Sequence, residues 1–207
     1  MKKESDKNTQ NPILQISHIT KTFPGVKALT DVSIDFYPGE VHALLGENGA
    51  GKSTLIKIVS GVYTPTDGKM IFDGQERSYK NPGEALNAGI SVIHQELSIA
   101  NDLSVAENIF VGREPVRGKN KFLLDRRKME ADAQEALDFM KVNFKATDIA
   151  GELSAAQQQM IEIAKVITRN SKMVIMDEPT SSLSESEIEA LFYQIKLLKE
   201  KNVAIIY

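Results

Sequence analysis

The stretch from residue 41 to residue 61 constrains the fold of this 207-residue chain more than any other part of it. An apolar run at 41–45 leads into residues 46–53, GENGAGKS, which match the pattern G-x-x-x-x-G-K-[ST] without a mismatch. A helical pattern follows from Ser53 to Ser60, and Gly61 stands where a helix C-cap is expected. The sequence therefore predicts a buried strand, a phosphate-binding loop and a helix in direct succession.

Each residue type of this loop suits a bound phosphate. Glycines allow successive backbone N–H groups to converge on the β-phosphate, and the N-terminal amides of the helix favour an anion. Lys52 offers a positive charge to the β- and γ-phosphates, and the Ser53 hydroxyl is a ligand for Mg²⁺. We predict that a nucleoside triphosphate contacts one continuous set of residues: Gly46, Glu47, Asn48, Gly49, Ala50, Gly51, Lys52, Ser53 and Thr54.

Two adjacent acids follow a second apolar run, Met173–Met176. In P-loop proteins an acid at this strand end meets Mg²⁺ through its water shell, which is the role expected of Asp177. Glu178, one residue further, is placed to polarise the water that attacks the γ-phosphate. On their own, two acids would equally fit a solvated strand end. The phosphate loop about 125 residues upstream favours the functional interpretation.

Strand and helix patterns alternate along the chain, which predicts an α/β fold with a parallel-sheet core. Strand-like patterns at 13–19, 32–36 and 69–72 predict an antiparallel β subdomain toward the N-terminus, after a polar tail at 1–12. Residues 96–165 are expected to form a helical subdomain, with a less regular basic stretch at 112–127. An amphipathic helix at 184–198 and a strand at 203–206 complete the prediction.

Composition excludes several classes of function. The chain has no cysteine, so it has no disulfide framework and no thiolate metal site. A net charge of -3 gives no global attraction to nucleic acid, and we interpret the basic stretch at 113–127 as a solvated surface. His42 and His94 are interpreted as packed residues rather than metal ligands. The polar N-terminus and the short apolar runs predict a cytosolic chain that reaches a membrane only through a partner.

A segment upstream of the apolar run 173–176 and its two acids resembles the signature of ATP-binding cassettes (ABC), which usually reads LSGGQ. It consists of Leu153, Ser154, Ala155, Ala156 and Gln157, followed by QQMIEIAK. Ser154 and Gln157 also have capping-box spacing, so the signature should open a helix. Four segments are similar to those of the ribose/galactose-type monosaccharide importers, in which one polypeptide carries two cassettes: KTFPGVKAL, GENGAGKSTL, HQEL and MDEPTSSL. The resemblance covers about residues 13–207 and is to the first cassette.

The resemblance implies roles for further residues. Phe23 would stack on the adenine of ATP, and Gln95 would contact Mg²⁺ and link the site to a transmembrane permease. The implied catalytic residues are thus Glu178, Lys52 and Gln95, and the implied metal ligands are Ser53, Gln95 and Asp177. The signature would face ATP on a second cassette, and residues 181–184 would cross to that site. The implied setting is the cytoplasmic face of a membrane, with permease subunits and, indirectly, a periplasmic or lipid-anchored sugar-binding protein as partners, and no nucleic acid.

The chain departs from the family pattern at three places. Ala155 and Ala156 replace the signature glycines, which would crowd the partner's γ-phosphate or change the turn, and Ser184 stands where many cassettes have aspartate. Tyr207 stands last, so the histidine that the family places after this strand is missing, and we expect a C-terminally truncated domain. Three alternatives remain open: a nucleoside importer, a soluble cassette ATPase of translation or DNA repair, and a non-catalytic nucleotide-binding module.

Overall fold

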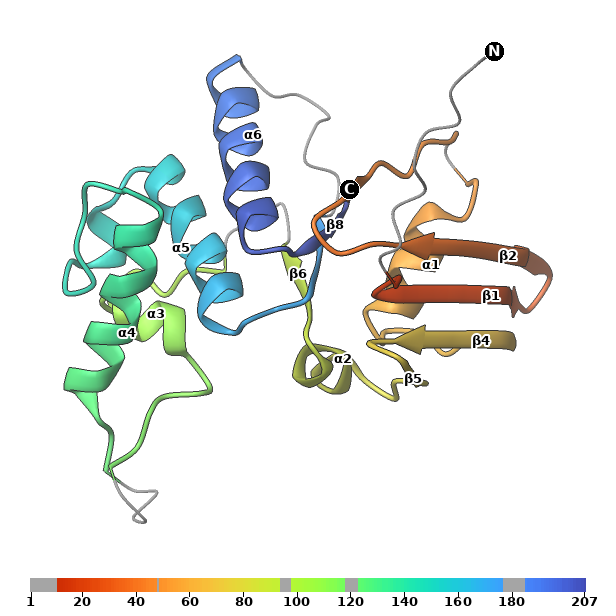
Figure 1. The fold of residues 1–207 in the computed structure, drawn as a ribbon, viewed down its shortest axis with the longest axis horizontal. Coiled ribbons are helices and arrows are strands. Elements are labelled where there is room, and N and C mark those ends of the chain that lie inside the picture. Colours follow the sequence, from red (N-terminus) through yellow and green to blue (C-terminus); the bar gives the residue numbers. More distant parts are fainter. Residues whose placement is uncertain (1–10, 48, 94–97, 118–122, 177–184) are drawn as a thin grey trace.

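The computed structural model describes residues 11–47, 49–93, 98–117, 123–176 and 185–207. They form an antiparallel sheet, a parallel sheet and a group of helices (Figure 1). In chain order the elements are β1 (Leu14–Phe23), β2 (Val26–Phe36), β3 (Val41–His42), α1 (Lys52–Val59), β4 (Asp67–Phe72), β5 (Gln75–Glu76), α2 (Pro82–Ala88), β6 (Ile90–Ile93), α3 (Val105–Phe110), α4 (Arg126–Phe139), the 3-10 helix η1 (Ala150–Glu152), α5 (Ala155–Thr168), β7 (Met173–Met176), α6 (Glu185–Glu200) and β8 (Ala204–Ile206).

An antiparallel sheet lies toward the N-terminus, as predicted, and its strand order is β2-β1-β4-β5. Leu14 pairs with Phe36 on one side and with Phe72 on the other, and all three side chains are fully buried. The β1–β2 ladder is interrupted near His18 and Asp31, which both have positive φ and whose side chains hydrogen-bond at 2.6 Å. Such an interruption bends a strand pair and increases its twist.

The parallel sheet has the order β3-β8-β7-β6 and forms the central layer. All four residues of β7 are buried, because the sheet is covered on both faces. Met173 and Ile175 join a hydrophobic core with α1 and the antiparallel sheet, whereas Val174 and Met176 join a second core with α3, α4 and α5. The continuous apolar run MVIM is therefore the expected sequence for a strand between two cores.

The helices α3, α4 and α5 pack on one another beyond the second face of the parallel sheet (Figure 1). A less regular stretch was predicted at 112–127; its described residues before α4, 112–117 and 123–125, contain only an isolated antiparallel bridge between Val116 and Leu124, and α4 begins at Arg126. The strand expected at 41–45 is shorter in the structure: β3 ends at His42, backbone hydrogen bonding to the β8 segment continues to Leu44, and Leu45 is 91% exposed. In the described part of the chain, the helices are all too short or too polar to cross a membrane.

Candidate nucleotide-binding site

The phosphate loop begins at one edge of the parallel sheet, where its strands end. Ile206 pairs with both His42 and Ile175, so the residues that follow β3 and β7 leave the sheet level with each other. One strand lies between them, which separates β3 from β7 by about 10 Å. Leu44 donates its N–H to the Tyr207 carbonyl at 2.7 Å, which extends the sheet toward the loop. This edge is where a P-loop protein collects its phosphate and metal ligands.

The loop itself is shaped by two glycines and one lysine. Gly49 and Gly51 have φ of 87° and 91°, which side-chain-bearing residues rarely adopt. A Cβ on Gly51 would lie 2.6 Å from the Ala28 carbonyl oxygen, so the loop sits directly against β2. Lys52 folds back and donates from Nζ to the carbonyls of Gly46 at 2.5 Å and Glu47 at 3.0 Å. The ammonium group is thus held across the loop that is predicted to surround the phosphates.

The N-terminus of α1 points its amide donors into this loop. The N-cap is Gly51, which has no side chain to satisfy those donors, and the first turn contains no acidic residue. The amides and the helix dipole therefore favour an anion. Ser53 lies in this first turn with an exposed side chain. Its hydroxyl and the carboxylate predicted after β7 are oxygen donors, which fit a hard cation such as Mg²⁺.

An aromatic pair joins the end of β1 to the turn after α1. The half-buried Phe23 ring packs edge-to-face on Tyr63, with the ring centroids 5.3 Å apart. Lys21 Nζ lies 5.1 Å from the Phe23 centroid and donates to the Thr64 carbonyl at 2.8 Å, and Lys57 Nζ lies 5.6 Å from the Tyr63 ring. The sequence predicted Phe23 as a stacking residue but missed Tyr63. The sequence of residues 61–63, which follow α1, contains no local pattern that predicts this contact.

The predicted capping box is present at the signature. Ser154 is the N-cap of α5; its Oγ accepts from the Gln157 N–H, and its own N–H donates to Gln157 Oε1 at 2.9 Å. Ala155 and Ala156 are the first two helical residues and their side chains are exposed. Because alanine adopts the helical conformation freely, the replacement of glycine requires no different turn at these positions. The two methyl groups instead add to the exposed surface of the helix N-terminus.

The signature and the phosphate loop lie on opposite faces of the parallel sheet. The buried residues of α5 belong to the core shared with α3 and α4, and those of α1 belong to the core shared with the antiparallel sheet. Figure 1 shows α1 and α5 separated by the strands of the parallel sheet. Within one chain, Ser154 is therefore not brought to the loop around Lys52.

Several predicted residues lie outside the described part of the chain: Asn48, His94, Gln95, Asp177, Glu178 and residues 181–184. Met176 and Ile93, which precede the acids and Gln95, end adjacent strands at the edge that carries the phosphate loop. His42 is a packed residue, as interpreted from the sequence. Its ring lies 4.9 Å from that of Phe36, and its Nε2 is 3.4 Å from the Tyr37 amide nitrogen.

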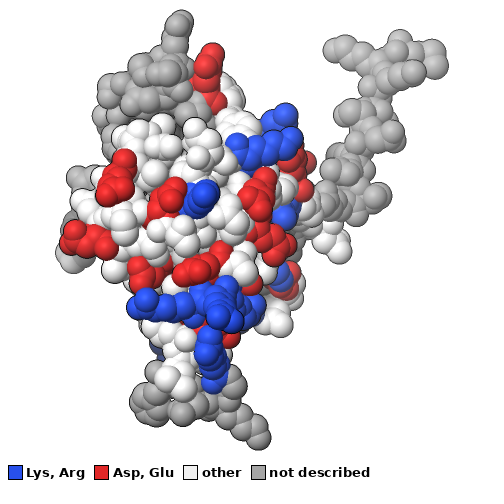
Figure 2. Space-filling view, turned by 90° about the vertical axis from the view of Figure 1, so that its left-hand side faces the viewer, with Lys and Arg blue, Asp and Glu red and all other residues white. Residues whose placement is uncertain are grey.

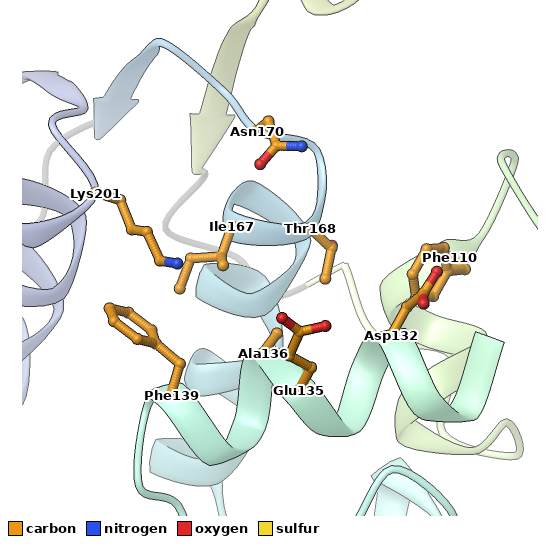
Figure 3. A pocket seen from close by; sticks show the side chains of 9 residues that line it. All are labelled: Phe110, Asp132, Glu135, Ala136, Phe139, Ile167, Thr168, Asn170 and Lys201. Atoms are coloured by element: carbon orange, nitrogen blue, oxygen red, sulfur yellow. The ribbon is translucent and has the colours of Figure 1, made fainter. Parts of the chain in front are cut away.

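A pocket of about 410 Å³ lies on the helical side, between α4, the end of α5 and the turn after α6 (Figure 3). Its lining combines Phe139 and Ile167 with the polar Glu135 and Thr168, and Lys201 Nζ lies 4.2 Å from the Phe139 ring centroid. None of its nine lining residues belongs to the predicted nucleotide site. This pocket is therefore separate from the chemistry of the phosphate loop.

Known proteins resemble the chain in sequence. The family described as ABC transporter matches residues 29–181. A Halalkalibacterium halodurans protein, provisionally named a ribose/galactose/methyl galactoside import ATP-binding protein, is 52% identical over 195 residues. The ribose import ATP-binding protein of Yersinia pestis is 47% identical over 196 residues. These matches cover 94% and 95% of this chain but only 37% and 38% of the relatives.

Solved structures give the same result for the fold. The ADP conformation of an ATP-binding cassette of an ABC transporter superposes with a TM-score of 0.80 at 30% sequence identity. That match covers 95% of this chain and 80% of the solved one. A nucleotide-free ATP-binding cassette from an ABC transporter superposes with a TM-score of 0.77, also at 30% identity, over 95% of this chain and 80% of that one.

Proposed function

Because the chain belongs to the ABC transporter family, we propose that it binds and hydrolyses MgATP as the first cassette of a bacterial importer for a ribose- or galactose-type monosaccharide. The observation that carries the proposal is the phosphate loop. Its uncapped helix N-terminus and the ammonium of Lys52 converge at the sheet edge where β7 also ends. The names of relatives about half identical to the chain support a sugar as the cargo.

The chemistry proposed for the site is in-line attack of water on the γ-phosphate. Lys52 exchanges its two loop carbonyls for phosphate oxygens, and the first amides of α1 donate to the β-phosphate. Glu178 orients and polarises the attacking water. Ser53, Asp177 and Gln95 would hold Mg²⁺, which supplies charge neutralisation at the β- and γ-phosphates.

The base of ATP is proposed to lie on Phe23. Tyr63 contacts the Phe23 ring edge-to-face, and Lys21, whose Nζ lies over that ring, is held by its hydrogen bond to the Thr64 carbonyl. Offset or edge-to-face aromatic contacts contribute about 0.5–1.5 kcal/mol beyond burial of area. The pair therefore provides a platform that is already formed when the nucleotide arrives.

The catalytic unit is proposed to need a second cassette. Ser154 and the N-terminus of α5 lie across the parallel sheet from their own phosphate loop, which supports their use by the site of a partner cassette. Closure of the two cassettes would then move permease subunits at the cytoplasmic face of the membrane. A sugar-binding protein outside the cell would supply the cargo, and no nucleic acid takes part.

Nucleotide binding is tested with this chain and a fluorescent ATP analogue. We expect saturable binding in the presence of Mg²⁺ that Lys52→Ala abolishes, whereas Lys199→Ala, at an exposed position near the end of α6, leaves it unchanged. Circular dichroism of each variant confirms that it is folded. Equal binding by the Lys52→Ala variant would refute the assignment of the phosphate loop.

Hydrolysis and cargo are tested with the full-length protein in vesicles that contain its permease and sugar-binding protein. We expect Glu178→Gln to retain ATP binding and to lose turnover, and ATPase activity to rise with ribose or galactose. Unchanged turnover in the variant would refute the role of Glu178, whereas no turnover by the unmodified protein would favour a non-catalytic module. Stimulation by nucleosides instead of sugars would reassign the cargo.

A further inference from the structure

The connection between α3 and α4 carries a concentration of positive charge that the nucleotide site does not use. The described residues of 113–128 include five Lys or Arg against two acids, although the whole chain has a net charge of -3. Figure 2 shows Lys and Arg side chains gathered toward the lower end of this face, with acidic and basic residues interspersed above them. A local excess of this kind attracts anionic surfaces.

Exposed apolar side chains lie among these basic residues. Val116 is 39% exposed, and Leu123 and Leu124 are 57% and 50% exposed. Backbone hydrogen bonds keep them together, because Arg117 N–H donates to the Leu123 carbonyl at 2.8 Å and Asp125 N–H donates to the Pro115 carbonyl at 2.7 Å. Three large apolar residues are thus fixed in water on two short paired segments. Such a patch is typical of a surface that is covered in use.

The charged neighbours of the apolar side chains are only partly paired. Lys128 is paired with Asp132 at 2.8 Å, and Arg117 approaches Asp125 at 3.7 Å. Arg126 and Arg127 are exposed, and neither takes part in the ion pairs found among the described residues. Three further acids lie nearby: Glu114 accepts from the Gly112 N–H, Glu107 interacts with the charge of Arg126, and Glu130 is exposed one turn further along α4. The two adjacent arginines are therefore the strongest feature for an anion to contact.

We propose that a basic ridge formed by Val116, Arg117, Leu123, Leu124, Arg126 and Arg127 rests directly on an anionic phospholipid surface. The arginines would pair with lipid phosphates while the leucines enter the headgroup layer. A nucleic acid would satisfy the charges but leave the leucines in water, so the combination favours lipid. This contact goes beyond the proposed function, because it requires neither nucleotide nor permease.

The ridge is tested by sedimenting this chain with vesicles of phosphatidylcholine alone or mixed with phosphatidylserine. We expect binding only to the anionic vesicles, weakened by salt. Arg126→Ala with Arg127→Ala should reduce the partition coefficient about fivefold for each charge removed. Leu123→Ala with Leu124→Ala should also reduce the partition coefficient, by about fourfold for each methylene or methyl group that no longer enters the lipid. The matched control, Lys27→Ala with Lys199→Ala, removes two exposed charges elsewhere and should leave binding unchanged.

A second measurement uses the absence of cysteine from the sequence. Leu124→Cys gives a single thiol for an environment-sensitive fluorophore, and Val26→Cys, at a position 61% exposed on β2, gives a matched control label. We expect a blue shift on anionic vesicles for the first label only. Equal binding to neutral vesicles, no shift at Leu124→Cys, or equal loss in the lysine control would each overturn the proposal, and in that case an acidic protein would remain as the occupant to test.

Discussion

Replacing Gly51 by alanine tests whether the phosphate loop is fixed against β2 as the structure indicates. The new Cβ would lie 2.6 Å from both the Ala28 carbonyl oxygen and Leu29 Cδ2, and φ at this position is +91°. A left-handed conformation costs an alanine about 1–2 kcal/mol. Forcing the neighbours apart adds about 1–3 kcal/mol, and the stiffer unfolded chain offsets about 0.4–1 kcal/mol. These ranges together give an expected net loss of unfolding free energy of about 1–5 kcal/mol.

Gly74 provides the matched control for this substitution. Its φ is +72°, but a Cβ there would have no atom within 4 Å, so Gly74→Ala carries the conformational cost alone. With a urea m-value of about 2 kcal/mol/M, the midpoint should fall by about 0.5–2.5 M for Gly51→Ala and by less than about 1 M for Gly74→Ala, with m unchanged. Equal midpoints for the two variants would refute the close approach of the loop to β2.

Three further perturbations test other parts of the structure. Tyr63→Ala should weaken binding of a fluorescent ATP analogue by a few fold while Tyr63→Phe retains it, since the contact with Phe23 is between rings; equal losses would refute the pairing. Ser154→Ala should cost about 1 kcal/mol in thermal unfolding, whereas Ser154→Asp should keep the cap of α5. The hydrogen bond from the Ser104 backbone N–H lowers the pKa of Glu107 below its ordinary value of 4.5, so its stabilising effect is present above pH 4.5 and is lost as the pH falls through the folded-state pKa. Urea midpoints measured across acid pH should therefore fall less steeply in Glu107→Gln, which keeps the capping-box acceptor, than in the unmodified chain.

Local signals explain the parts of the site that the sequence predicted. The helix after the phosphate loop and the capping box at Ser154 both depend on contacts within a few residues, and both are present. The contact between Phe23 and Tyr63 joins residues 40 positions apart. It exists only because β1 and the turn after α1 meet in three dimensions, which no local pattern encodes.

Strand β6 was missed for a different physical reason. Ser91 interrupts its apolar pattern, yet the residue is buried, and its hydroxyl lies 2.7 Å from that of Ser171. A serine in a short apolar run lowers the expectation of a buried strand, but in the structure the two buried hydroxyls satisfy each other's hydrogen bonding. The exposed Leu45 is the converse case, because an apolar side chain there predicted a strand that ends three residues earlier.

The central place of β8 has a consequence for when the protein can fold. Ile205 pairs with Val41 on one side and with Val174 on the other, so β3, which leads into the phosphate loop, is joined to β7 only through a strand that lies 164 positions later than Val41 in the sequence. Pairings of such long sequence separation form slowly. During synthesis, the helices and the antiparallel sheet can assemble while the parallel sheet stays divided. The β8 segment has no predicted contact with a nucleotide, yet the phosphate loop after β3 and the acids after β7 can come together only once β8 has paired with both strands.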